Sequence, residues 1–152
     1  MHLTIDGFGA NPEKLASEEL VRELLDRLPE RIAMTKIATP HVQRYVGEKP
    51  EDWGVSGFVL IAESHIAVHT FPKHRYVWVD VFSCKGFEGE LAVDEVTVAF
   101  DLEKARIRIH DRGLEYPHIV DEAVPVAARE REAVTAAGAR RERESRALEA
   151  GS

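Results

Sequence analysis

Three closely spaced runs in the middle of the chain most constrain its fold. They are VSGFVLIA (55–62), HIAVHTF (65–71) and YVWVDVF (76–82), and each is apolar or alternates apolar with polar residues. Runs of this length, rich in β-branched and aromatic side chains, are typical of strands. Pro72 to Arg75 separate the last two runs, as a hairpin connection would. The centre of the chain is therefore predicted to form an antiparallel sheet.

The flanking segments predict helices and further strands. His2 to Ile5 reads as a short strand, followed by a helix that Asn11 caps, with Pro12 at its first position and Pro29 at its end. Residues 32–46 suggest an irregular strand broken near Pro40. A helix is predicted over 91–104, with Lys104 on its apolar face, and ARIRIHDR (105–112) alternates as a strand does. This order predicts an α+β fold, a two-layer sandwich with a mainly antiparallel β-sheet and helices packed on one face.

Composition excludes several classes of partner. The chain has 152 residues and a formal net charge of −7, which suits one domain and disfavours nucleic acid or an anionic membrane as partner. It contains no apolar run long enough to span a bilayer, and its N-terminal residues do not have the pattern expected of a secretion signal, so we expect none. Its single cysteine, Cys84, fits a reducing compartment, so we expect a cytoplasmic protein.

Residues 62–71, AESHIAVHTF, concentrate polar groups that suggest chemistry. A zinc site would need three or four ligands, but His65 and His69 on one strand would lie roughly 13 Å apart, so no metal site is expected. A serine hydrolase is also disfavoured, because no G-x-S-x-G elbow precedes Ser64. On periodicity alone, the histidines could simply form hydrogen bonds within a sheet.

Four blocks of residues together resemble a known family. They are GVSG (54–57), AESH (62–65), HTFP (69–72) and DVFSC (80–84), and DGFGANPEKL (6–15) is similar to the family's entry into its first helix. In this order and spacing they resemble the bacterial S-adenosylmethionine decarboxylase family. The resemblance covers roughly residues 1–112. It implies one decarboxylase domain over 1–116, with a charged Ala/Arg/Glu-rich tail over 117–152.

The resemblance implies a self-processing, pyruvoyl-dependent enzyme of polyamine and spermidine biosynthesis that needs no metal. The chain would be cut between Glu63 and Ser64, and Ser64 would become the pyruvoyl group that forms a Schiff base with the substrate. His69 and Ser56 would assist processing, and Cys84 would act as proton donor during decarboxylation. Relatives of this type assemble as dimers of processed protomers, which implies a homodimer here.

Two departures from the family pattern concern recognition of the substrate. Lys73 stands where the family carries a glutamate that binds the ribose, and an ammonium cannot accept those hydrogen bonds. No phenylalanine lies between Phe8 and Phe58, so Tyr45 or Trp53 would have to stack on adenine. S-adenosylmethionine therefore remains one alternative, and L-arginine or L-ornithine is another, with an acidic partner such as Glu51, Asp52 or Asp80. A third alternative is a non-catalytic binding homologue.

Overall fold

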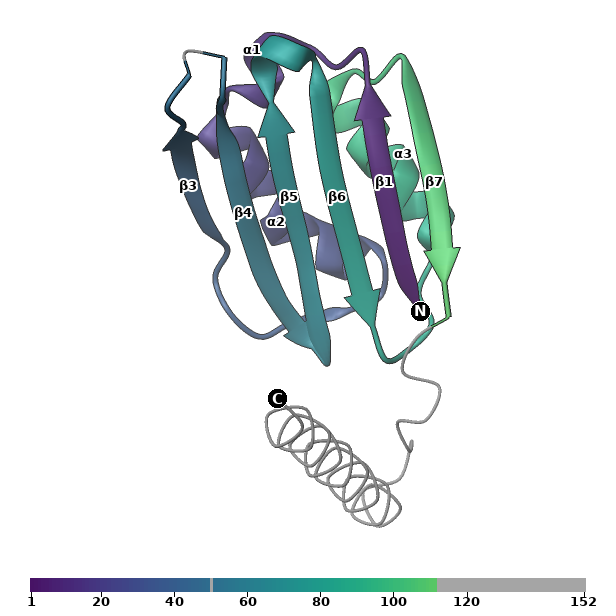
Figure 1. Cartoon of the computed structure of the whole chain (residues 1–152). Helices are drawn as coiled ribbons and strands as arrows, with labels where there is room; N and C mark the ends of the chain where they lie inside the picture. The colour runs from purple at the N-terminus through teal and green to yellow at the C-terminus, as the bar shows by residue number, and fades with distance from the viewer. Residues whose placement is uncertain (50, 112–152) are drawn as a thin grey trace, which may run out of the picture. The chain divides into compact units, whose positions relative to one another are not determined.

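The computed structural model describes residues 1–49 and 51–111, which build one antiparallel sheet with helices on one side (Figure 1). The strands are β1 (His2–Phe8), β2 (Thr35–Lys36), β3 (His41–Val46), β4 (Trp53–Ala62), β5 (Ser64–Phe71), β6 (Tyr76–Ser83) and β7 (Lys104–His110). The helices are α1 (Pro12–Leu15), α2 (Glu18–Arg31) and α3 (Gly89–Phe100), and a 3-10 turn, η1, spans Pro72–His74. The strand order is β2-β4-β5-β6-β1-β7, and β3 also pairs with β4. The predicted α+β sandwich is confirmed.

The two faces of the sheet differ in burial because successive side chains of a strand point to opposite faces. In β5, Ile66, Val68 and Thr70 are buried toward the helices, and His65 and His69 lie on the other face. In Figure 1, α2 and α3 lie behind the sheet, and no helix of the described residues covers the face toward the viewer. We call this second face the open face. Its central side chains are those of His65, Ala67, His69 and Phe71 in β5 and their cross-strand neighbours.

The first helical segment is divided in two, which corrects the single helix predicted from Pro12 to Leu28. Asn11 caps α1 as expected, but Ser17 starts α2 by accepting a hydrogen bond from the Leu20 N–H. Pro29 does not end α2, which continues to Arg31. The φ angle of proline fits a helix. The missing N–H of Pro29 removes one backbone hydrogen bond, and this loss falls in the last turn of α2.

The second helical segment starts earlier and ends earlier than predicted. The helix α3 begins at Gly89 and ends at Phe100, where Asp101 adopts a left-handed conformation (φ +52°). Lys104, predicted on the helix, is the first residue of β7. The β-prone run VTVAF is helical because Val96, Ala99 and Phe100 pack into the core between α3 and the sheet.

One further prediction is met in part, and one is not tested. The irregular strand near Pro40 is present as the separate strands β2 and β3. The domain end at residue 116 and the tail over 117–152 lie outside the described residues. Among the described helices, none is both long and apolar enough to cross a membrane.

Candidate functional site

Ser64 lies at the tight turn between β4 and β5. Ile61 pairs with Ser64 across the two strands, and Glu63 alone separates the end of β4 at Ala62 from the start of β5. Ser64 has a φ angle of +152°, which residues other than glycine rarely adopt, and its hydroxyl lies 3.5 Å from Nδ1 of His65. Glu63 is exposed and Ser64 is half-buried. The chain thus turns sharply at Ser64.

Cys84 lies beside Ser64 at the same end of the sheet. Ser64 is in register with Ser83, the last residue of β6, and Cys84 follows directly. The Ser83 side chain is buried and holds this end of β6, since its hydroxyl donates to Sδ of Met34 at 3.6 Å and accepts from the Lys85 N–H at 3.0 Å. Cys84 itself is a half-buried free thiol. Cys84 is thus one residue beyond the cross-strand partner of Ser64.

Ser56 and His69 form a second polar group, on the open face. They are direct cross-strand partners in β4 and β5, and Oγ of Ser56 lies 3.0 Å from Nδ1 of His69. Ser56 is half-buried and His69 is exposed. The hydrogen bond orients the imidazole and leaves its other ring nitrogen, Nε2, as the group that could exchange a proton with a reacting atom.

The two groups do not meet within one chain. Ser64 and His69 are five residues apart on the same strand, and at about 3.3 Å per residue this separates them by roughly 16 Å. Direct proton transfer needs donor and acceptor within about 3 Å of each other. The sequence had suggested that Ser56, Ser64, His69 and Cys84 act together, and the structure brings them together only as two pairs.

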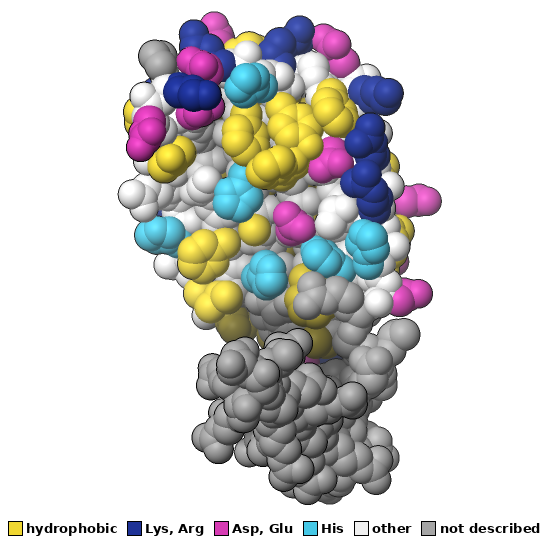
Figure 2. All heavy atoms as spheres, in the orientation of Figure 1, with side chains coloured by type: hydrophobic (Ala, Val, Ile, Leu, Met, Phe, Trp, Pro, Cys, Tyr) yellow, Lys and Arg dark blue, Asp and Glu magenta, His cyan; other side chains and the backbone are white. Residues whose placement is uncertain are grey.

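The candidate substrate residues Phe8 and Lys73 lie at the other end of the sheet. Phe8 belongs to what we call the aromatic cluster, which consists of Phe8, Phe71, Tyr76 and Trp78 and has ring centroids 4.8–5.9 Å apart between contacting pairs. Figure 2 shows hydrophobic side chains gathered on this part of the open face, with histidines below them. Trp78 is also the cross-strand partner of His69, so the aromatic cluster adjoins the Ser56–His69 pair.

Tyr76 and Trp78 were not predicted from the sequence as site residues, although the alternation of YVWVDVF indicates their position. In YVWVDVF, Val77, Val79 and Val81 are buried against the helices, so the residues between them must lie on the open face. Burial raises the pKa of the Tyr76 hydroxyl above its usual value, the carboxylate of Asp6 adds to this effect, and a hydrogen bond from Trp78 opposes it.

Charged groups flank the aromatic cluster on β6, β1 and β7. Asp6 forms an ion pair with Arg108 at 3.1 Å, and Asp80 accepts a hydrogen bond from His2 Nε2 at 3.1 Å when that nitrogen carries a proton. Both carboxylates line a shallow pocket of about 360 Å³ on the open face that also includes Trp78 and Arg108. Arg108 offsets the charge of Asp6, which leaves the Asp80 carboxylate and the Trp78 ring as the groups that could face a cationic ligand.

Comparison with known proteins identifies the family. A model of the family described as S-adenosylmethionine decarboxylase matches residues 1–113. The chain belongs to this family. The S-adenosylmethionine decarboxylase proenzyme of Clostridium botulinum (strain Loch Maree) is 35% identical over 113 residues, which cover 74% of this chain and 92% of that protein. The proenzyme of Archaeoglobus fulgidus is 34% identical over 113 residues, 74% of this chain and 96% of that protein.

A solved structure supports the family assignment and the fold. The crystal structure of the adenosylmethionine decarboxylase from Aquifex aeolicus superposes with a TM-score of 0.64 at 30% identity, covering 74% of this chain and 89% of that chain. The recognition made from GVSG, AESH, HTFP and DVFSC is therefore confirmed.

The residues that depart from the family pattern lie at the edge of the open face. Lys73 is an exposed residue of η1. Tyr45 is 62% exposed on β3 and pairs with Gly54, which places it on the open face diagonally beside Ser56. Trp53 is half-buried, and the guanidinium of Arg44 lies 4.3 Å from the centre of its ring. Tyr45 is thus the better placed of the two rings to contact a ligand near Ser56.

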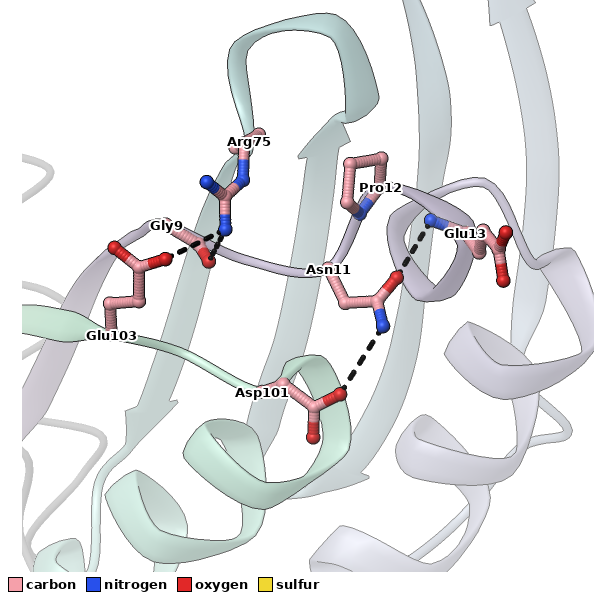
Figure 3. A pocket seen from close by; sticks show the side chains of 7 residues that line it. All are labelled: Gly9, Asn11, Pro12, Glu13, Arg75, Asp101 and Glu103. Atoms are coloured by element: carbon pink, nitrogen blue, oxygen red, sulfur yellow. Dashed lines mark hydrogen bonds and ion pairs between the residues drawn. The ribbon is translucent and has the colours of Figure 1, made fainter.

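A second pocket, of about 540 Å³, lies at the end of the sheet that carries η1 (Figure 3). Arg75, which has a φ angle of +51°, donates to the carbonyl oxygens of Gly9 and Ala10 and forms an ion pair with Glu103. Asn11 contacts the Glu13 N–H and the Asp101 carboxylate. These hydrogen bonds and this ion pair hold the loop that follows Phe8 in place.

No group of three or more His, Cys, Asp or Glu side chains in residues 1–49 and 51–111 is arranged to hold a metal ion. His65 and His69 lie on a strand, as the argument against a shared ion assumed.

Proposed function

We propose that the chain is a proenzyme that cleaves itself between Glu63 and Ser64 and then decarboxylates S-adenosylmethionine. The main support is the placement of Ser64 in a strained turn with Cys84 beside it, where a chemically altered residue 64 would have a proton donor at hand. The names of the similar proteins, which are S-adenosylmethionine decarboxylase proenzymes and an adenosylmethionine decarboxylase, also support the proposal.

Self-cleavage requires only groups of the chain and one water. Oγ of Ser64 attacks the carbonyl carbon of Glu63, the C–N bond breaks, and the peptide becomes an ester with a free amine. A base then removes the Cα proton of residue 64, and the Cβ–O bond breaks with release of the Glu63 carboxylate. The resulting dehydroalanine takes up water and loses ammonia, which leaves a ketone. We assign the base to His69, oriented by Ser56.

The distance from His69 to Ser64 supports a homodimer in which each site uses both protomers. Within one chain the two residues are roughly 16 Å apart along β5. The open face carries Phe58, Leu60 and Trp78, each more than 40% exposed, and such an apolar surface suits contact with a second copy. Packing about a two-fold axis would present His69 of one protomer to Ser64 of the partner and the reverse.

Residue 64 and Cys84 are suited to a pyruvoyl group. Ser64 is half-buried at a strand end and is followed by a regular strand that would anchor the new N-terminus. A pyruvoyl group there supplies a ketone that takes up the electron pair released with CO2. The Cys84 thiol would hold the proton that replaces the lost carboxylate on the α-carbon, and it lies beside the cross-strand partner of residue 64.

The aromatic cluster and its carboxylates support a substrate that is both aromatic and cationic. S-adenosylmethionine has an adenine ring that could stack on Trp78 or Tyr45, and its sulfonium charge suits the carboxylate of Asp80.

The substrate is tested by measuring CO2 release from carboxyl-labelled S-adenosylmethionine, arginine and ornithine by the same cleaved sample. We expect turnover of S-adenosylmethionine with at most trace turnover of the other two. Preference for arginine or ornithine would refute the substrate and leave the chemistry standing. No turnover of any of the three by fully cleaved protein would refute the decarboxylase.

A further inference from the structure

Thr70 is a buried polar residue to which the proposed chemistry gives no role. Its side chain is 2% exposed, on the helix-facing side of β5. The hydroxyl donates to the carbonyl oxygen of Leu15 at 2.7 Å and accepts from the N–H of Val55 at 2.8 Å. It thereby connects three segments, namely the end of α1, β4 and β5.

These hydrogen bonds lie directly behind the Ser56–His69 pair. Val55 precedes Ser56 on β4, and Thr70 follows His69 on β5. The backbone register of the two strands runs from the Ile61–Ser64 pair to the Ser56–His69 pair and ends there. At the next position, where a backbone partner would otherwise receive the Val55 N–H, the Thr70 hydroxyl receives it instead.

Gly54 permits the close approach of the strands at this point. A Cβ atom on Gly54 would overlap the carbonyl oxygen of Thr70. Two neighbouring residues of β4 are thus held against Thr70. Val55 is held by a hydrogen bond, and Gly54 is held by direct backbone contact. Small movements of β5 at Thr70 would therefore shift His69 relative to Ser56.

We infer that Thr70 is a positioning residue for the Ser56–His69 pair, acting through the backbone of Val55 and the anchor on Leu15. The inference rests on the proposed role of this pair in self-cleavage. Without the hydroxyl, the buried Val55 N–H loses its partner and the end of the strand pair is free to separate. The 3.0 Å contact between Ser56 and His69 would then be lost or lengthened.

The first test follows the rate of self-cleavage of newly translated protein. Thr70→Val keeps the shape but removes the hydroxyl, and it should slow cleavage about a hundredfold, as expected for a misplaced reacting group. Thr70→Ser keeps the hydroxyl and should cleave within about threefold of the wild-type rate. Val79→Ala is the matched control. Val79 is 1% exposed and lies on the helix-facing side of β6, as Thr70 does on β5, and it makes none of the contacts on which the inference rests.

The outcomes separate positioning from general stability. The inference predicts that Val79→Ala cleaves at the wild-type rate even where its melting temperature is as low as that of Thr70→Val. It is overturned if Thr70→Val cleaves at the wild-type rate, or if both variants slow cleavage equally.

A second test does not depend on cleavage. In the Ser64→Ala background, the 15N chemical shifts of the His69 ring report its hydrogen bond to Ser56. Adding Thr70→Val should move these shifts toward those seen with Ser56→Ala, while adding Val79→Ala should leave them unchanged. Unchanged shifts with Thr70→Val overturn the inference. If the wild-type chain never cleaves, the proposed function fails, and this comparison still decides the role of Thr70.

Discussion

Cleavage in mixed dimers tests whether the site is built from two protomers. One variant, His69→Ala, keeps Ser64 but lacks the base, and the other, Ser64→Ala, keeps the base but cannot be cut. In a dimer of one chain of each kind, only the site that combines Ser64 of the first with His69 of the second is complete. Each variant alone should stay intact.

The expected extent of cleavage follows from random pairing. When both chains are coexpressed in equal amounts, about half of the dimers are mixed, so about half of the His69→Ala chains find a Ser64→Ala partner. About half of the His69→Ala chains should therefore be cleaved and none of the Ser64→Ala chains. The reasoning depends on the separation of roughly 16 Å between Ser64 and His69 along β5.

The assay is the denatured mass of the coexpressed chains, with a C-terminal tag on the His69→Ala chain to distinguish its fragments. Mixing the separately purified homodimers without exchange of subunits is the control and should give no cleavage. If the coexpressed chains remain intact, His69 does not act on the partner. Cleavage of His69→Ala by itself would show that His69 is not the base at all.

Three further predictions concern individual side chains. Cys84→Ala should cleave itself normally but lower kcat for CO2 release by about 10²- to 10⁴-fold, because the thiol acts only in the second reaction; slow cleavage of this variant would contradict the assignment. Lys73→Glu should lower KM for S-adenosylmethionine by about tenfold, because a carboxylate can accept two ribose hydrogen bonds; an unchanged KM would exclude the contact. Asp6→Asn should lower the pKa of Tyr76 toward 10.0, because it removes a negative charge that disfavours the phenolate. An ultraviolet titration, with Tyr76→Phe as the reference, measures this shift. Because the pKa of Tyr76 is raised in the folded chain, its contribution to the free energy of unfolding is complete below pH 10 and is lost as the pH rises further.

The fold could be predicted from the sequence where periodicity was strong. The alternation of HIAVHTF and YVWVDVF predicted β5 and β6, and the β-branched run before them predicted β4. The errors arose where tertiary contacts outweighed local signals. Pro29 remains in α2, and the β-prone VTVAF is helical because its apolar side chains fill the space under the sheet.

Part of the arrangement of the candidate site followed from the sequence, and part did not. The motif blocks suggested Ser56, Ser64, His69 and Cys84 as candidates, and strand spacing alone already separates Ser64 from His69. The partner of Thr70 could not be foreseen, because Leu15 lies 55 positions away in the sequence and meets it only through the packing of α1 on the sheet. The grouping of Phe8 with Tyr76 likewise depends on the pairing of β1 with β6.

The denatured mass of freshly purified protein tests the central claim most directly. Self-cleavage predicts two fragments, residues 1–63 and residues 64–152, the second without a free amino group at its N-terminus, and it predicts that Ser64→Ala stays whole. A wild-type chain that remains a single intact species after prolonged incubation would contradict the proposed chemistry and leave the non-catalytic binding homologue as the better interpretation.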